Sequence, residues 1–356
     1  MRYDNLLPAL LLGVLLGLGA VSPRAAGAQG SSAAVDPAPF PVRYRGHVSW
    51  LRTNPLFVRP GERVTLEALE PSGAVTAAGG GPVDRGGPRP EAGGRDESAP
   101  YALRLEATGG RWERLAARRW AWTAPPEPGS HRITLAPGAS AGEGRSTAAP
   151  VTFNAFVLVP ASEVRNGELN GYRIGEYPRS AFRGLERYRP PTGFVEVTPE
   201  NRDLKLSPHF RLGDFLSKQP AGWPRYVVVQ ERLLWKLEAV IAGLHRRYGA
   251  SSLHVMSGYR TPAYNASIGQ VKYSRHQYGD AADVFVDESP RDGRMDDLNG
   301  DGRSSRADAR AVYRLVDRLV RTSLVDRLIG GLGSYPATPS HGPFVHIDAR
   351  GYRARW

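Results

Sequence analysis

The 356-residue sequence contains no cysteine. This absence excludes disulfide bonds, thiolate metal ligands, a cysteine nucleophile and a lipidated cysteine anchor. Any protein-bound zinc ion must therefore be held by histidine, aspartate or glutamate. Without disulfides the folded chain relies on its hydrophobic core, and 41% hydrophobic residues are sufficient to build one.

Long apolar runs are scarce, and the one that stands out extends from Leu6 to about Val21. Arg2 precedes this run and the small residues "AGA" follow at 26–28, which is the pattern of a cleaved signal peptide over residues 1–28. The alternative is a membrane anchor, but the run is short and rich in glycine. We therefore expect a periplasmic or extracellular protein with no stable membrane anchor after cleavage.

Acidic residues are fewer than basic ones, 35 against 47, which gives a formal net charge of +12. An exported protein with this charge favours polyanionic surroundings such as cell-wall polymers. The arginines are scattered, and no helix-turn-helix, zinc-finger or RNP signature accompanies them. Nucleic acid is therefore not an expected partner.

The first half of the chain has a β pattern. Residues 29–41 have the composition of a flexible linker, and residues 42–161 contain short, partly alternating segments such as "RVTLEAL" and "VTFNAFVLV" between Gly/Pro turns. This spacing predicts an all-β sandwich of the Ig-like kind. The Gly/Pro-rich residues 77–98 are expected to form a disordered loop within it, and the proline-rich residues 162–199 a connector.

The second half, residues 200–356, has an α+β pattern. Apolar residues recur at helical spacing over 228–248, two arginines stand in the last turn, and Gly249 follows as a stop signal. A second amphipathic helix is predicted over 308–328. Strands are predicted at 251–257, 281–287 and 343–348.

The decapeptide "SRHQYGDAAD" at 274–283 contains two potential metal ligands, His276 and Asp283, with Gly279 permitting a tight turn between them. His346 lies within the predicted strand "FVHID", where alternation places His346 and Asp348 on the same face. A catalytic zinc ion takes three protein ligands and leaves one position for water. The spacing alone also fits an ordinary turn that leads into a strand.

Three segments together resemble the M15-type zinc peptidases, which include the D,D-carboxypeptidases and the LAS-related murein endopeptidases. These segments are "SGYRTPAYN" at 257–265, the decapeptide at 274–283, and "FVHID" at 344–348. The terminal "GLGSYPATPSHGPFVHIDARGYRARW" is most similar to the DUF882 or YcbK-like murein endopeptidase branch. The resemblance covers roughly residues 200–356 and implies a hedgehog/D,D-peptidase-like α+β domain that acts on peptidoglycan.

The resemblance also implies roles for individual residues. His276, Asp283 and His346 become the zinc ligands. Arg260 becomes a cation near the scissile bond, with a loop salt bridge as its alternative role. Ser274 becomes a substrate-binding residue or, alternatively, a plain turn residue. Tyr259, next to Arg260 in the same motif, is also assigned to substrate binding.

One position departs from the family pattern. Many M15 carboxypeptidases place a glutamate, the general base, three residues before the last ligand, whereas this chain has Pro343. Asp348 is slightly favoured as the general base in place of that glutamate, and His341 is the other candidate. The expected function is an exported zinc metallopeptidase that hydrolyses stem peptides or cross-links of peptidoglycan. If neither residue reaches the metal, the alternative is a non-catalytic cell-wall-binding or signalling module with a structural zinc, as in hedgehog-type domains.

A second metal motif occupies residues 297–308, "DLNGDGRSSRAD". Asp297, Asn299 and Asp301 alternate along it, Arg303 offers a backbone carbonyl, and Asp308 stands at position twelve of the loop. This spacing is typical of dockerin-like calcium loops, with Asp in place of the usual final Glu. The alternative is an acidic surface turn. Calcium bound here is expected to stabilise the peptidase domain and to take no part in catalysis.

Overall fold

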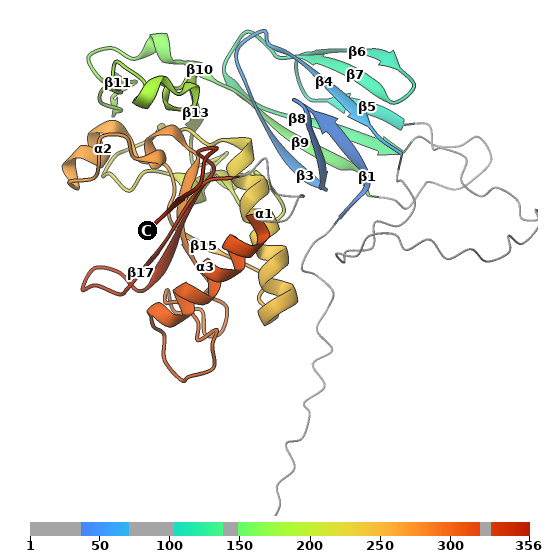
Figure 1. Cartoon of the computed structure of the whole chain (residues 1–356). Helices are drawn as coiled ribbons and strands as arrows, with labels where there is room; N and C mark the ends of the chain where they lie inside the picture. Colours follow the sequence, from blue (N-terminus) through green and yellow to red (C-terminus); the bar gives the residue numbers. More distant parts are fainter. Residues whose placement is uncertain (1–36, 71–102, 138–148, 321–328) are drawn as a thin grey trace, which may run out of the picture. The chain divides into compact units, whose positions relative to one another are not determined.

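A computed structural model describes residues 37–70, 103–137, 149–320 and 329–356 (Figure 1). The predicted signal peptide at 1–28 and the predicted disordered loop at 77–98 lie outside these residues. The described residues belong to one compact unit with two hydrophobic clusters, one in the N-terminal β-domain and one centred on the C-terminal α+β part, which Phe57 and Phe156 of the β-domain also join. Within the described part of the chain, no helix is long and apolar enough to cross a membrane.

The β-domain consists of two sheets that enclose one buried cluster, which includes Trp120, Trp122 and Phe153. The five-stranded sheet has the order β2 (His47–Leu51), β1 (Pro37–Tyr44), β4 (Arg63–Ala68), β7 (Arg119–Thr123) and β6 (Arg111–Ala116). The four-stranded sheet has the order β3 (Thr53–Val58), β9 (Val151–Val157), β8 (Gly129–Pro137) and β5 (Leu103–Ala107).

The boundaries of the β-domain differ from the predicted ones. Strand β1 begins at Pro37, inside the segment predicted as a linker, because Ala38 and Phe40 are buried in the domain's core. Strand β3 was not predicted, since Pro55 interrupts its pattern, yet it pairs in parallel with β9. Strand β6 was also missed, because all of its residues are exposed and show no alternation.

The predicted connector at 162–199 is an ordered part of the C-terminal core. It contains the small hairpin of β11 (Glu168–Leu169) and β12 (Tyr172–Arg173), and β13 (Gly193–Val197) pairs with both β10 (Val159–Pro160) and β14 (Arg225–Val227). Short 3-10 turns occur at η1 (Ala161–Glu163), η2 (Phe182–Gly184), η3 (Glu186–Tyr188) and η4 (Leu212–Phe215). Tyr172, Ile174 and Phe194 are buried in the same cluster as the long helix α1, which explains why this proline-rich segment is ordered.

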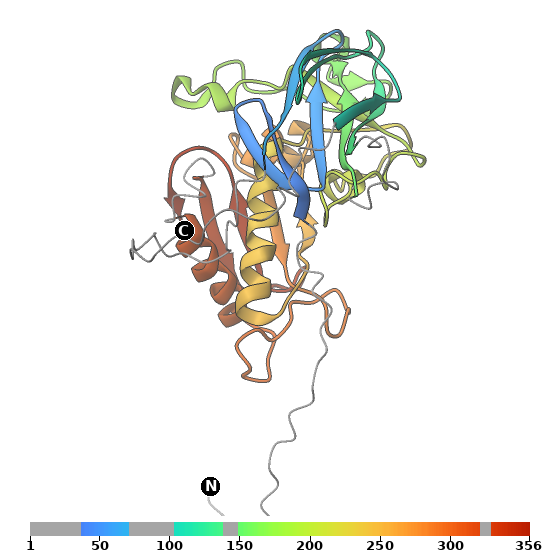
Figure 2. The same cartoon turned by 90° about the vertical axis from the view of Figure 1, so that its right-hand side faces the viewer.

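The central sheet of the C-terminal part has the order β15 (His254–Ser257), β16 (Ala281–Phe285), β18 (Phe344–Asp348), β17 (Gly331–Tyr335) and β19 (Ala354–Arg355). Helices α1 (Glu231–Tyr248) and α3 (Arg306–Val320) lie side by side on one face of this sheet (Figures 1 and 2). The short helix α2 (Pro262–Ser267) and the 3-10 turn η5 (Arg275–Tyr278) complete the fold.

The packing of α1 confirms the helix predicted from its periodicity. Leu237, Ile241 and Leu244 are fully buried, and Gly249 ends the helix in the left-handed conformation with φ 74°. These helical side chains pack against Val345 and Ile347 of β18. Because side chains alternate along a strand, His346 and Asp348 face the opposite side of the sheet, away from both helices.

Candidate metal centre

The structure brings His276, Asp283 and His346 together. Strands β16 and β18 pair so that Asp283 and His346 are direct cross-strand neighbours, and η5 places His276 beside them. The Nδ1 of His346 lies 2.8 Å from Oδ1 of Asp283 and 3.2 Å from Nε2 of His276. Nε2 of His276 lies 3.3 Å from Oδ1 of Asp283, which closes a triangle of donor atoms.

This triangle fits a single divalent ion. Ligands held at about 2.0–2.1 Å from a tetrahedral zinc ion lie roughly 3.3 Å from one another. The observed separations of 2.8–3.3 Å are close to that value. Among the described residues the group comprises these three side chains and no fourth, so the protein leaves one coordination position open.

The imidazoles of His276 and His346 are each oriented by a hydrogen bond on the ring nitrogen that faces away from the donor triangle. Nδ1 of His276 lies 2.6 Å from the carbonyl oxygen of Gly258, so Nδ1–H donates there and Nε2 is directed to the centre. Nε2 of His346 lies 3.1 Å from Oδ2 of Asp348, so this ring presents Nδ1 to the centre. A carboxylate or carbonyl behind each ring fixes its tautomer and raises its basicity as a metal ligand.

The electrostatics of the three groups suit a cation. Burial alone would raise the pKa of the Asp283 carboxyl, but His276 and His346 hold it well below its usual range. Burial lowers the pKa of His276 despite the nearby Asp283, so this imidazole is neutral. Burial also opposes the charged form of His346, yet the carboxylates of Asp283 and Asp348 raise its pKa to about 9. A cation in the triangle therefore takes the place of the proton on His346.

Asp348, the slightly favoured general base, is placed behind His346 and away from the donor triangle. Its side chain is fully buried. One oxygen accepts the backbone N–H of Gly331 at 2.7 Å, and the Arg350 guanidinium donates to both oxygens. Burial would raise the pKa of this carboxyl, but His346 and Arg350 hold it well below its usual range. These contacts favour an orienting role over proton transfer.

The donor triangle forms part of the wall of a cleft of about 620 Å³. The cleft is also lined by three further predicted site residues, Arg260, Ser274 and His341. Nδ1 of His341 lies 2.8 Å from the Gly342 carbonyl oxygen, and its ring packs edge-on against Phe344. This contact assigns the ring hydrogen to Nδ1 and leaves Nε2 as an acceptor.

Arg260 contacts the metal-site carboxylate directly. Its guanidinium pairs with Oδ2 of Asp283, and its Nε donates to the Ser257 hydroxyl at 2.9 Å. Ser274 is nearly buried and precedes η5, where its side chain makes no capping hydrogen bond. Tyr259 does not line the cleft. It is buried, and its hydroxyl lies 2.9 Å from that of Tyr177, so its placement is that of a core residue.

Two aromatic residues of the cleft were missed from the sequence. Tyr335 and Trp356 both line it, and the indole of Trp356 lies 5.3 Å from the imidazole of His346, measured between ring centres. The available signal was the alternating glycine pattern of "GGLGSY", because glycine within a strand often marks a close approach. A Cβ added at Gly333 would lie 2.4 Å from Nε1 of Trp356, so only glycine leaves room for the indole.

The turn between His276 and Asp283 depends on Gly279. This residue has φ +68°, and a Cβ added there would lie 2.3 Å from the carbonyl oxygen of Val228. We expect Gly279→Ala to lower the free energy of unfolding by about 2–5 kcal/mol, through left-handed strain plus this collision. Gly269 is the matched control, since its φ is +67° and nothing lies within 4 Å of an added Cβ. Gly269→Ala should cost only about 1–2 kcal/mol in urea unfolding, and equal losses in the two variants would contradict this account.

The predicted calcium loop lies within the described residues, but its carboxylates do not form a close group of three. Its carboxylates are outside the single group of three metal-ligand donors among the described residues. Instead, Asp297 accepts the backbone N–H groups of Gly300, Asp301 and Gly302. Asp308 is fully buried and accepts from Leu298, Asn299 and Ser305. The carboxylates therefore organise the loop's backbone in this structure, and calcium binding stays a prediction.

Comparison with known families places the metal centre in context. Residues 209–298 match the family model described as Peptidase M15. This segment includes His276 and Asp283 and ends before His346, which strand pairing brings to them. A comparison with curated proteins found no match. The match does not distinguish the DUF882 or YcbK-like branch. The chain carries an M15-type peptidase domain.

Proposed function

We propose that this protein is a zinc metallopeptidase that hydrolyses peptide bonds in peptidoglycan stem peptides or cross-links. The observation that carries the proposal is the triangle of three buried donor atoms in the wall of a cleft, which no fourth His, Asp or Glu side chain of the described residues joins. A structural zinc site is closed by four protein ligands, whereas a catalytic one keeps a position for water or substrate. The triangle therefore favours a catalyst over the alternative of a non-catalytic wall-binding or signalling module.

Zinc, when bound by His276, Asp283 and His346, supplies Lewis-acid polarisation of a carbonyl and acidification of water. Arg260 lines the same cleft and carries a fixed positive charge. Its guanidinium is suited to hold the oxygen on which negative charge develops, or a terminal carboxylate of the substrate. Its present partner, Asp283, would be shared with the metal, which weakens that pairing and releases donor groups towards the cleft.

His341 is the residue proposed to accept the proton. Its Nδ1 faces the Gly342 carbonyl, so its Nε2 has the free lone pair that a general base needs. Asp348 is proposed to act indirectly, by holding the ring of the zinc ligand His346 in place.

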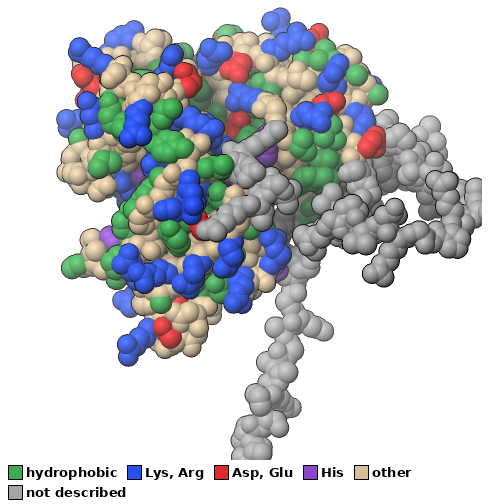
Figure 3. All heavy atoms as spheres, in the orientation of Figure 1, with side chains coloured by type: hydrophobic (Ala, Val, Ile, Leu, Met, Phe, Trp, Pro, Cys, Tyr) green, Lys and Arg blue, Asp and Glu red, His purple; other side chains and the backbone are tan. Residues whose placement is uncertain are grey.

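The choice of peptidoglycan rests on charge and on the expected export. Lys and Arg side chains are spread over the face drawn in Figure 3 and outnumber Asp and Glu in the sequence. Positive charge of this kind concentrates a protein on an anionic polymer. We propose that the mature chain acts in the periplasm or outside the cell, which N-terminal sequencing of the exported protein would test.

Digestion of purified muropeptides, analysed by mass spectrometry, tests the function. Cleavage should occur with the zinc-loaded protein and cease after chelation. The masses of the products identify the bond that is cut, and so separate an endopeptidase from a D,D-carboxypeptidase. Intact muropeptides together with retained binding to cell walls would support the non-catalytic module instead.

We also propose that the loop at 297–308 binds calcium, on the strength of its ligand spacing. Saturating calcium is then expected to raise the melting temperature by about 3–8 °C over the value in EGTA. Asp297→Asn preserves an acceptor for the backbone N–H groups but removes a charge, so it should abolish the shift. Asp292→Asn, in the neighbouring turn, is the control. Identical melting curves with calcium and with EGTA would refute calcium binding.

A further inference from the structure

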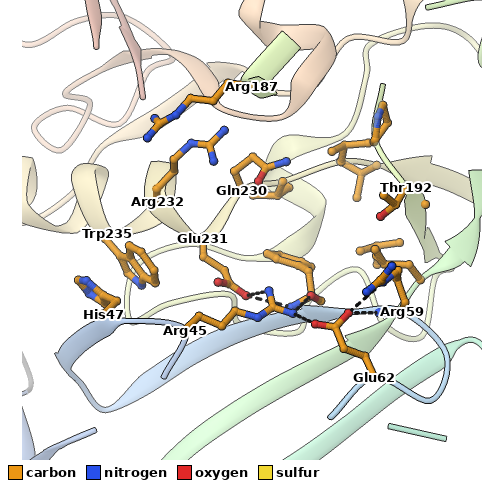
Figure 4. Close-up of a pocket in the computed structure, with 18 of the residues that line it drawn as sticks. Arg45, His47, Arg59, Glu62, Arg187, Thr192, Gln230, Glu231, Arg232 and Trp235 are labelled. Carbon is orange, nitrogen blue, oxygen red and sulfur yellow. Dashed lines mark hydrogen bonds and ion pairs between the residues drawn. The ribbon is translucent and has the colours of Figure 1, made fainter. Parts of the chain in front are cut away.

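A second cavity, of about 590 Å³, lies at the junction of the β-domain with the N-terminal end of α1 (Figure 4). On the β-domain side it is lined by the tight turn between β1 and β2, where Arg45 and Gly46 both have positive φ. On the other side it is lined by the first residues of α1 and by Arg187. Its lining shares no residue with that of the metal-site cleft.

Both acidic residues that line this cavity are neutralised within the protein. Glu231 pairs with Arg45 at 2.9 Å, and its other contacts include the backbone N–H of Phe57. Glu62 pairs with Arg45 at 2.7 Å and with Arg59 at 3.4 Å. Figure 4 shows these four side chains as one network along one side of the cavity. Two glutamates and two arginines leave this side with no net charge.

The other two arginines of the cavity are not balanced in this way. Arg187 donates to a neutral group, the Ala349 carbonyl oxygen, at 2.6 Å. Arg232 pairs with Asp280 at 2.9 Å, but that buried carboxylate is already held through both oxygens by Arg275. Arg232 and Arg275 therefore share the Asp280 carboxylate, and Arg187 adds a third positive charge nearby, so positive charge is in local excess.

Two further observations indicate strain from this excess charge. Nε of Arg232 is buried and has no hydrogen-bond partner among the described residues, which is an uncommon state for a guanidinium donor. Burial lowers the pKa of Arg187, and the neighbouring charges of Arg232 and Arg275 lower it further, although Asp280 acts in the opposite direction. An anion held by the terminal nitrogens of the two guanidinium groups would offset the repulsion.

The remaining lining suits an organic anion better than a bare ion. The ring of Trp235 is stacked on His47 with their centres 3.6 Å apart, and Trp235 lines the cavity. Gln230 and Thr192 add neutral polar side chains. A wall with aromatic and amide groups next to two arginines matches a ligand that carries a polar body and one anionic group.

We infer that this cavity is a second binding site, separate from the metal centre, for a small ligand with a carboxylate or phosphate group held by Arg187 and Arg232. The inference does not depend on peptidase activity. Only the choice of one probe, N-acetylmuramic acid, rests on the proposed function, because that sugar is the carboxylate-bearing unit of peptidoglycan.

Calorimetric titration of the full-length protein with N-acetylmuramic acid and, separately, with inorganic phosphate tests the site. We expect saturable binding of at least one of these anions, and the comparison identifies whether the cavity prefers a carboxylate or a phosphate. N-Acetylglucosamine, a neutral relative of the first probe, should bind at least about tenfold more weakly. Arg187→Gln and Arg232→Gln should each weaken anion binding by at least about tenfold, whereas Arg104→Gln, an exposed position in β5, should not.

The metal centre also attracts anions, so the titrations are repeated with His276→Ala. Binding at the cavity persists in that variant and is lost in the arginine variants, whereas binding at the metal shows the opposite pattern. Arg232→Gln disturbs the buried Asp280, so its melting temperature is checked, and Arg187→Gln decides the matter if Arg232→Gln fails to fold. Absence of saturable binding by both anions, or unchanged affinity in Arg187→Gln, overturns the inference.

Discussion

Replacement of His276 with alanine is expected to lower kcat/KM for muropeptide hydrolysis by about 10³-fold or more. The metal's contribution to transition-state stabilisation is several kcal/mol, and each 1.36 kcal/mol corresponds to a factor of ten. The loss follows from the geometry, since Nε2 of His276 supplies one of the three donor atoms that the described part of the chain brings together. With two donors left, the site holds zinc too weakly to keep it occupied at micromolar concentrations.

Two measurements on the same samples separate metal loss from other causes. Zinc content, by elemental analysis, should fall together with activity in His276→Ala, and added zinc should not restore either. In the unaltered protein, chelation should remove both, and added zinc should return both. The matched control is His254→Ala, an exposed histidine of β15 that contacts Phe285 and lies outside the cleft lining. A His276→Ala protein with near-normal turnover would refute the metal assignment.

The grouping of the three proposed metal ligands could be anticipated from the sequence because each sits in a local pattern of known geometry. Strand alternation placed His346 on the face away from the core, and the left-handed Gly279 allowed the chain to turn between His276 and Asp283. What joined the two segments was the register of β16 and β18, with Asp283 opposite His346. That register is a long-range property that the sequence does not show, and the family resemblance implied only that the three residues act together.

The surroundings of the ligands were less predictable, because they depend on contacts between distant segments. Strand alternation correctly placed Asp348 on the same face of the strand as His346. It could not show that Gly331 and Arg350 donate hydrogen bonds to the carboxylate of Asp348. Strand β17 was missed because its glycines are typical of a loop, although they are what allow Trp356 to approach. The order of residues 162–199 was missed for a similar reason, since few buried side chains hold a proline-rich segment in place.

The roles of His341 and Asp348 are expected to separate when each is replaced by its neutral analogue. His341→Gln should lower kcat by about 10²–10⁴-fold, the usual contribution of a general base, while zinc affinity stays unchanged. The ring of His341 lines the cleft without belonging to the donor triangle, so its loss removes proton transfer and spares the metal.

Asp348→Asn should behave in the opposite way. Its carboxylate holds Nε2 of His346 at 3.1 Å, and loss of such an outer contact lowers metal affinity by about 10–100-fold. Excess zinc should then restore most of the activity of Asp348→Asn and none of that of His341→Gln. If Asp348 is instead the base, its asparagine variant will bind zinc normally and stay inactive at any zinc concentration. The two assignments therefore predict opposite responses to one added ion, because a group that orients a ligand can be compensated by mass action and a group that accepts a proton cannot.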